Sequence, residues 1–297
     1  MAENLIDLRR RIKSLTSIRK TFRAMKTISA VRLKRSVAEL NKIRPVMDKI
    51  ISILRRVGPA VDMDSHPLFK QREGGKTVMV VVSADRGLCG AFNSHLIGAA
   101  EKRYQNQLDE TGANIALVIA GNKAHTHFLK KGYPIKKNYE SIMSRLKYKD
   151  AEDLSKYLQD IFKDPKENIK KIEFVFTRYI SASKSRPEVK QLFPLGSEWK
   201  QEEADNGNEE VIDFIFEPSE KEIFAYLLPK DLNGLVQQTL LQSAASEHMA
   251  RMIAMEQASQ NADEMARTLT LNMNKLRQAS ITGELLEIIT ATEALRK

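Results

Sequence analysis

Apolar residues recur at steps of three and four along both ends of the chain, residues 2–56 and 231–297. Such spacing places them on one face of a helix, and in the N-terminal stretch it is the seam pattern of a coiled coil. The N-terminal positions are Leu5, Leu8, Ile12, Leu15, Ile18, Phe22 and Met25. The C-terminal positions are Leu241, Ala245, Met249, Met252, Leu269, Met273, Leu276, Leu285 and Ile288. We therefore predict two long helices that pair antiparallel, with a separate domain inserted between them.

Helix-breaking residues are rare in these two stretches. From Asp231 to Lys297 there is no proline, and at about 1.5 Å per residue a helix of that length spans roughly 100 Å. This length disfavours the alternative, in which both stretches are surface helices on one globular core. In the first stretch, Pro45 predicts a kink, and Gly58 with Pro59 predicts the helix end.

The middle of the chain predicts an α/β domain. The apolar, β-branched run TVMVVV at residues 77–82 predicts a central strand covered on both faces. Further strands are predicted at 115–120, 172–179, 189–195 and 211–216, with helices at 92–107, 122–129 and 152–162, and a surface loop at 197–210. The alternation favours a mainly parallel sheet with crossover helices. The predicted division is 1–57 for the first helix, 58–75 for a linker, 76–229 for the α/β domain and 230–297 for the second helix.

Charge is unevenly placed along the chain, whose formal net charge is +10. Residues 1–56 carry 16 Lys and Arg against 4 acidic residues. Such a helix fits a solvated face, a nucleic-acid or lipid contact, or a surface for an acidic protein partner, and charge alone does not choose among them. No apolar run is long enough to cross a bilayer. The N-terminal residues do not form a secretory signal, so we expect a cytoplasmic protein.

Few residues in this sequence suggest a catalytic, metal-binding or cofactor-binding site. The turn DRGLCG after the first predicted strand lies where doubly wound folds bind ligands, but it matches neither GxxxxGK[ST] nor GxGxxG. Its Cys89, the single cysteine, excludes an intrachain disulfide and is expected to be a small packed residue. His125 and His127 lie two apart on a predicted helix, a poor geometry for a shared metal, and are expected to be solvated. His66, His95 and His248 have no evident partners. We expect no catalytic site, no metal site and no cofactor.

Three stretches together resemble the gamma subunit of bacterial F-type ATP synthases. They are IDLRRRIKSLTSIRKTFRAMKTISAVRLKRS near the N-terminus, VVSADRGLCGAFN in the middle, and SEHMARMIAMEQASQNADEM with LTLNMNKLRQASITGELLEI near the C-terminus. The resemblance implies a rotor shaft, in which an antiparallel coiled coil carries an inserted Rossmann-like domain. It implies as partners the alpha and beta subunits of an alpha3beta3 ring, the epsilon subunit and the membrane c-ring. Proton-driven rotation of the c-ring would then be coupled to ATP synthesis or hydrolysis at the beta subunits, with control of ATPase activity and proton flow.

The resemblance also implies contact residues. Those expected to face the alpha and beta subunits are Arg9, Arg10, Lys13, Lys20, Arg23, Met25, Lys26, Arg86, Arg251, Arg277, Gln278 and Thr282. Those expected near the c-ring and epsilon are Arg44, Lys49, Asp213 and Glu217. The last residues, 281–295, should extend past the start of the first helix as a single apolar helix. The implied location is peripheral, on the cytoplasmic face of the bacterial inner membrane.

The chain departs from the family pattern at a few positions. Gly283 stands where glutamine is more usual, which costs about 1 kcal/mol of helix propensity. Thr27, Ile28 and Val31 are bulkier than the small residues common there, and the regulatory cysteine pair of the chloroplast form is absent. The alternative to the resemblance is a basic coiled-coil protein that binds nucleic acid, which the N-terminal charge alone would support.

Overall fold

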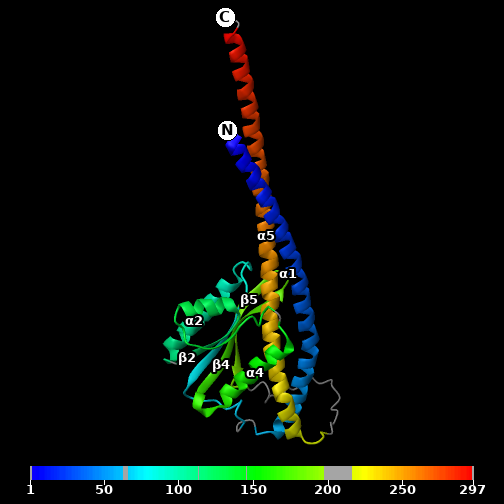
Figure 1. Ribbon diagram of the computed structural model, residues 1–297. Helices are drawn as coiled ribbons and strands as arrows, with labels where there is room; N and C mark the ends of the chain where they lie inside the picture. The colour runs from blue at the N-terminus through cyan, green and yellow to red at the C-terminus, as the bar shows by residue number, and fades with distance from the viewer. Residues whose placement is uncertain (1, 63–65, 113, 145, 197–215, 296–297) are drawn as a thin grey trace. The chain divides into compact units, whose positions relative to one another are not determined.

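Two long helices enclose an α/β region in the sequence (Figure 1). The structure, a computed structural model, describes residues 2–62, 66–112, 114–144, 146–196 and 216–295. The helices are α1 (Ala2–Val57), α2 (Phe92–Thr111), α3 (Asn122–Lys130), α4 (Tyr148–Lys163) and α5 (Glu220–Ala294). The strands are β1 (Lys76–Val82), β2 (Ile115–Ala120), β3 (Ile135–Tyr139), β4 (Ile169–Ser181) and β5 (Lys184–Phe193). The predicted order of long helix, α/β domain and long helix is therefore confirmed.

The chain divides into two compact units, which are described separately. Unit 1 comprises Met1–Ala30 and Arg251–Lys297, and unit 2 comprises Val31–Ala250. Each unit therefore contains one part of α1 and one part of α5.

The centre of unit 2 is a five-stranded mixed sheet with the order β3-β2-β1-β4-β5. The first four strands run parallel, and β5 pairs antiparallel with β4 at the edge. Val80 of β1 lies between Val118 of β2 and Phe174 of β4. Every residue of β1 except Lys76 is buried, so the apolar run at 77–82 is the central strand that its composition predicts.

Helices cover both faces of this sheet. On one face α2 and α3 pack on β1 and β2 through an apolar cluster that includes Leu96, Ala100, Ala124 and Phe128. On the other face α4 packs together with α1 and α5, which contribute Leu54, Val57, Phe224, Leu228, Leu232, Val236 and Leu240 to the larger cluster. Part of the cover on this face therefore comes from the two helices at the ends of the chain.

Several boundaries differ from the prediction. Helix α5 begins at Glu220, eleven residues before the predicted start at Asp231, and it continues through Pro229. Proline removes one helical hydrogen bond, but the flanking Phe224, Leu228 and Leu232 are buried in the core, and their burial offsets that loss. Helix α1 contains Pro45 and ends at Val57, directly before Gly58 and Pro59, where the sequence predicts its end. The predicted strand at 211–216 lies outside the described residues apart from Phe216.

The prediction missed strand β3. Its sequence IKKNY is polar, and its residues are only half-buried or exposed, because β3 is an edge strand paired on one side with β2. Hydrophobic periodicity has no signal at such a strand. The predicted strand at 189–195 exists but is longer and lies earlier, as β5.

Helices α1 and α5 approach each other closely in unit 2. Gly234 of α5 is buried, and a Cβ added to it would lie 2.0 Å from Sδ of Met47 on α1. The absence of a side chain at Gly234 therefore makes room for Met47, which is itself 5% exposed. By contrast, a Cβ at Gly283 would meet nothing within 4 Å.

This contact predicts opposite effects for two glycine replacements. Gly234→Ala should destabilise unit 2 by about 1–3 kcal/mol because the new methyl displaces Met47. Gly283→Ala, the matched control, should instead stabilise its helix by about 0.5–1 kcal/mol. Urea unfolding of each variant, and of Met47→Ala with and without Gly234→Ala, gives the coupling. Strictly additive costs for Met47→Ala and Gly234→Ala would show that the two positions do not interact.

Asp231 is a buried acid in α5. It is 0% exposed, and neither carboxylate oxygen has a hydrogen-bond partner among the described residues. Burial raises the pKa of Asp231 from 3.8 to about 7, and the nearby charge of Lys190 on β5 opposes this only in part. The neutral acid is therefore the form that the folded protein favours near and below neutral pH.

The raised pKa of Asp231 predicts that the free energy of unfolding falls as pH rises. Between about pH 4 and pH 7 the unfolded chain has lost this proton and the folded chain retains it, so the free energy of unfolding decreases by up to about 1.4 kcal/mol per pH unit. Above that window the contribution is constant. Asp231→Asn should remove this slope, whereas Asp160→Asn, at an exposed position on α4, should leave it. Urea unfolding at several pH values measures the slope, and an unchanged slope in Asp231→Asn would contradict the assignment.

Candidate functional site

The first half of α1 forms a basic surface in unit 1. Residues 1–30 contain eight Lys and Arg and two acidic residues. Of the residues predicted to contact the alpha and beta subunits, Arg9, Arg10, Lys13, Lys20 and Arg23 are exposed, whereas Met25 and Lys26 are half-buried. Most of this positive charge is therefore available at the surface, and the apolar seam beside it is half-buried except at Ile18, which is exposed.

Two ion pairs join α1 to α5 within unit 1. Arg19 pairs with Asp263, and Lys26 pairs with Glu256. From the first pair to the second, the residue number rises along α1 and falls along α5, so the two helices run in opposite directions here. The buried positions on α5 include Met255, Ser259 and Ala262, at steps of four and three, which is the spacing of a helix face packed against a partner.

The Arg19–Asp263 pair changes the titration of its carboxylate. The hydrogen bond from Arg19 is the largest cause that lowers the pKa of Asp263, and the nearby charges of Arg19, Arg267 and Arg23 lower it further. Arg267 also forms an ion pair with Asp263 within α5. Asp263 is therefore ionised at neutral pH.

A charge exchange tests the pairing of α1 and α5. Lys26→Glu places a carboxylate beside Glu256 and should lower the stability of unit 1, while Lys26→Glu combined with Glu256→Lys should recover most of the loss. Because both side chains are partly exposed, the coupling should be about 0.2–1 kcal/mol. Thermal unfolding at low and high salt measures it. If the double exchange is no better than the sum of the single changes, these two residues are not neighbours.

The end of α5 extends past the start of α1. In both ion pairs the residue numbers add to 282, so the first residue of α1, Ala2, lies level with residue 280. Beyond that point α5 continues to Ala294 (Figure 1). Its large apolar residues are 50–87% exposed here, namely Ile281, Leu285, Leu286, Ile288, Ile289 and Leu295. The predicted apolar single helix at the C-terminus is therefore present and has no cover from α1.

The other predicted contact residues fall in two places. Arg251 is half-buried, and Arg277, Gln278 and Thr282 are exposed on α5 in unit 1, on the same helix as the apolar end. Arg86 is exposed in unit 2. Unit 1 therefore contains all the predicted alpha- and beta-facing residues except Arg86.

The DRGLCG turn follows β1, and its side chains bond to groups of neighbouring segments. Asp85 accepts hydrogen bonds from the Asn122 backbone N–H at 3.2 Å and the Ser144 hydroxyl at 2.8 Å. Cys89 is 1% exposed, and its sulfur accepts from Nδ2 of Asn93 at 3.1 Å. These bonds fix the turn and the following helix. Cys89 is a packed residue, as the sequence predicts.

The histidines are better integrated than expected. His127 is partly exposed, and its Nε2 also bonds to Glu101 at 2.9 Å, a partner that the sequence did not predict. Nδ1 of His66 accepts from the Leu68 backbone N–H, and its ring packs edge-on against Phe69 and Phe224. Burial is the main cause that lowers the pKa of His66. His248 is buried in α5.

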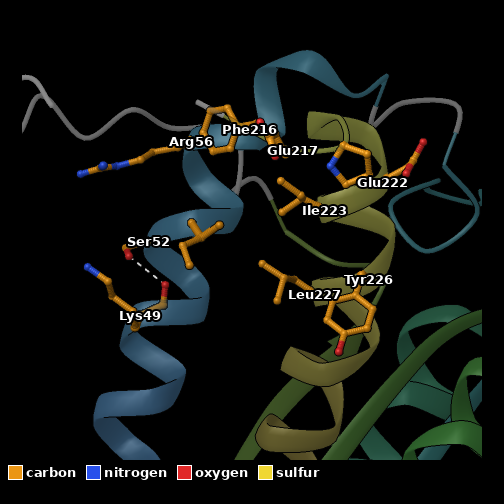
Figure 2. A pocket seen from close by; sticks show the side chains of 11 residues that line it. Lys49, Ser52, Arg56, Phe216, Glu217, Glu222, Ile223, Tyr226 and Leu227 are labelled. Carbon is orange, nitrogen blue, oxygen red and sulfur yellow. Dashed lines mark hydrogen bonds between the residues drawn. The ribbon is translucent and has the colours of Figure 1, made fainter. Parts of the chain in front are cut away.

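An apolar pocket of about 640 Å³ lies in unit 2 between the end of α1 and the start of α5 (Figure 2). Ile223 and Leu227 of α5 point toward α1, and Phe216 lies near the same opening. Two of the residues predicted to contact the c-ring and epsilon, Lys49 and Glu217, line this pocket. The pocket itself was not predicted from the sequence, because one of its walls is formed by the unpredicted first turns of α5.

The remaining two residues of that prediction are not placed at the pocket. Arg44 is exposed on α1 and does not line it. Asp213 lies outside the described residues. Among the described residues, His, Cys, Asp and Glu nowhere gather in a group of three that could hold a metal ion. No helix in the described ranges combines the length and apolarity that a membrane span requires.

Comparison with known proteins gives a family. The family model described as ATP synthase matches residues 4–295. The ATP synthase gamma chain of Pelotomaculum thermopropionicum is 36% identical over 292 residues, covering 98% of this chain and 99% of the relative. That of Geobacter metallireducens is 37% identical over 293 residues, covering 99% of each. The gamma chain of Aquifex aeolicus is 31% identical over 291 residues, covering 98% of this chain and 97% of the relative.

Solved structures show a similar fold. A chain from the mitochondrial ATP synthase of Euglena gracilis in rotational state 3 matches with a TM-score of 0.66 at 16% identity, covering 99% of this chain and 95% of that one. A chain of the rotor of the same enzyme in rotational state 1 matches with a TM-score of 0.60 at 15% identity, covering 95% and 100%. These likenesses concern the arrangement of long terminal helices around a central mixed sheet.

Proposed function

Because this chain belongs to the family of ATP synthase gamma chains, we propose that it is the central-stalk subunit, the rotor shaft, of a bacterial F-type ATP synthase. In this role it couples proton-driven rotation of the c-ring to ATP synthesis or hydrolysis at the beta subunits, and it influences ATPase activity and proton flow. The observation that carries the proposal is the full-length match to gamma chains of several bacteria.

We further propose that α1 and α5 form an antiparallel coiled coil and that the sheet domain is Rossmann-like. The oppositely directed ion pairs of Arg19 with Asp263 and Lys26 with Glu256 support the first. The parallel strand order β3-β2-β1-β4 with helices on both faces supports the second. A paired helix resists twisting and bending better than a single one, because each helix holds the other's seam in place. This is the property that a torque-bearing shaft requires.

The alpha and beta subunits are the proposed partners of unit 1. Its exposed Arg9, Arg10, Lys13, Lys20 and Arg23 attract acidic loops at long range without fixing one rotational position, because exposed charges in water interact weakly and broadly. Beyond residue 280, α5 exposes a row of large apolar side chains, and apolar contacts are not directional, so an apolar sleeve around them resists rotation little. Met25, Lys26, Arg251, Arg277, Gln278 and Thr282 complete the proposed contact surface, with Arg86 from unit 2.

The c-ring and the epsilon subunit are the proposed partners of unit 2. Lys49 and Glu217, at the pocket between α1 and α5, are the described residues that we assign to this contact together with Arg44. Asp213 belongs to the same proposal. The subunit would then touch the membrane only through the membrane-embedded sector, at the cytoplasmic face of the inner membrane.

Catalysis is proposed to lie in the beta subunits. At the end of β1, where doubly wound folds bind nucleotide, Asp85 and Asn93 bond to other groups of the same turn and its neighbours. The chain would thus serve an H⁺-transporting ATPase as a non-catalytic subunit without a cofactor of its own. The family assignment also favours this role over the nucleic-acid alternative.

Substitution at Met25 tests the coupling role. Met25→Lys adds a charge to the proposed beta-facing surface, where it must be desolvated against a partner, so ATP synthesis driven by a proton gradient should fall at least about tenfold. The matched control is Ser183→Lys, which adds the same charge at an exposed turn between β4 and β5. Synthesis is measured in inverted vesicles that contain the assembled complex.

A measurement of assembly distinguishes a loss of coupling from a loss of subunit binding. Co-purification of the alpha and beta subunits with the wild-type chain and with both variants would show that the loss is one of coupling. Normal synthesis in Met25→Lys would overturn the assignment of Met25 to the contact. Failure of the wild-type chain to assemble with alpha and beta would overturn the proposed function itself.

A further inference from the structure

A polar cavity of about 480 Å³ lies in unit 2 at the amino-terminal ends of β1 and β4. The DRGLCG turn lies at the other end of these strands, because it follows the carboxyl end of β1. The polar residues that line the cavity are Glu73, Thr77, Arg103, Gln107, Asn114, Lys170 and Lys171. Glu73 precedes β1, and the others come from β1, α2, β4 and the residue before β2, so five segments converge on one small space.

A buried carboxylate holds two of the cations in place. Glu173 of β4 is 0% exposed. Its Oε1 accepts from Nε of Arg103 at 2.8 Å and from Nε2 of Gln107 at 2.9 Å, and its Oε2 accepts from an Arg103 terminal nitrogen at 3.0 Å and from Nζ of Lys171 at 2.8 Å. The Arg103 contact is therefore bidentate, the geometry that best fixes a guanidinium group.

The carboxylate of Glu173 stays ionised in this environment. Burial by itself raises its pKa, but the hydrogen bonds from Arg103 and Lys171 together with their charges outweigh burial and lower the pKa below its ordinary value. Both cations are consequently fixed in position before any ligand arrives, and preorganised donors lose little freedom when they bind one.

Lys170 supplies a further positive charge. Its ammonium donates to the backbone oxygen of Glu73 at 3.2 Å, a neutral acceptor. Among the residues that the structure describes, no carboxylate forms an ion pair with Lys170, although its side chain is half-buried. The lining residues Arg103, Lys170, Lys171 and Glu73, together with the buried Glu173, carry a net charge of +1.

We propose that this cavity binds a small multivalent oxyanion of the phosphate class. Three cations and neutral amide and hydroxyl donors surround a space of a few hundred Å³, and tetrahedral oxyanions accept hydrogen bonds from several directions at once. A metal ion would need more carboxylate oxygens, and an extended polyanion would need an open groove. The carbonyl end of α2 at Gly112 disfavours an anion beside it, which places the ligand nearer Lys170 and Lys171.

This inference does not depend on the role as a rotor shaft, since it uses only unit 2. The test titrates the full-length protein with sodium pyrophosphate and with inorganic phosphate in a calorimeter, at constant ionic strength set with chloride. We expect saturable binding of one pyrophosphate per chain. Lys170→Gln should weaken it by about fivefold to tenfold, because one charge-assisted contact is lost. Lys170→Arg, which keeps the charge, should retain binding.

The matched control is Lys184→Gln. Lys184 is exposed at the start of β5, paired with Ser181 at the opposite end of β4 from Lys170, and its loss changes the net charge equally. It should change the pyrophosphate affinity less than about twofold, as expected for a distant screened charge. Thermal unfolding without ligand confirms that each variant is folded. Unsaturable binding by the wild type, equal weakening in Lys184→Gln, or equal loss in Lys170→Arg and Lys170→Gln would each overturn the proposal.

Discussion

The packing of α1 against α5 is the interaction on which the rest of the structure depends. Each helix carries an apolar stripe that must be removed from water, and in each unit the stripe of one helix lies beside the other helix. In unit 2 the approach is close enough that Gly234 must lack a side chain to accommodate Met47. In unit 1 it is marked by two ion pairs, which contribute less energy than the packing but define the direction of pairing.

The sheet domain depends on the same pair of helices. One face of the sheet is covered by α2 and α3, which are local in sequence, but the other is covered by α4 together with α1 and α5. Leu54 near the end of α1 and Leu232 in α5 share that core although almost 180 residues separate them. Closing such a core requires both ends of the chain, so the inserted domain cannot complete its core without the two terminal helices. The sheet and the parts of α1 and α5 in unit 2 therefore share one core.

The sequence predicted what hydrophobic periodicity can encode and missed what depends on tertiary context. The run at 77–82 is apolar at every position, and it became the buried central strand. Strand β3, with its sequence IKKNY, has no such signal, because an edge strand needs little apolar surface. Pro229 was read as lying before the last helix, although the buried residues around it hold α5 continuous. The charge of α1 was evident from composition, but its partners on α5 depend on register, which composition does not contain.

The same limit applies to the buried acids. In sequence, Glu173 and Asp231 are ordinary charged residues, and only the structure shows that both are completely buried. Glu173 is surrounded by Arg103, Lys171 and Gln107, so burial there preserves its charge and organises a polar cavity. Asp231 has no hydrogen-bonding partner among the described residues, so burial there favours the neutral acid. What a buried carboxylate does therefore depends on which neighbours the fold supplies, and two of those around Glu173, Arg103 and Gln107, come from a distant part of the chain.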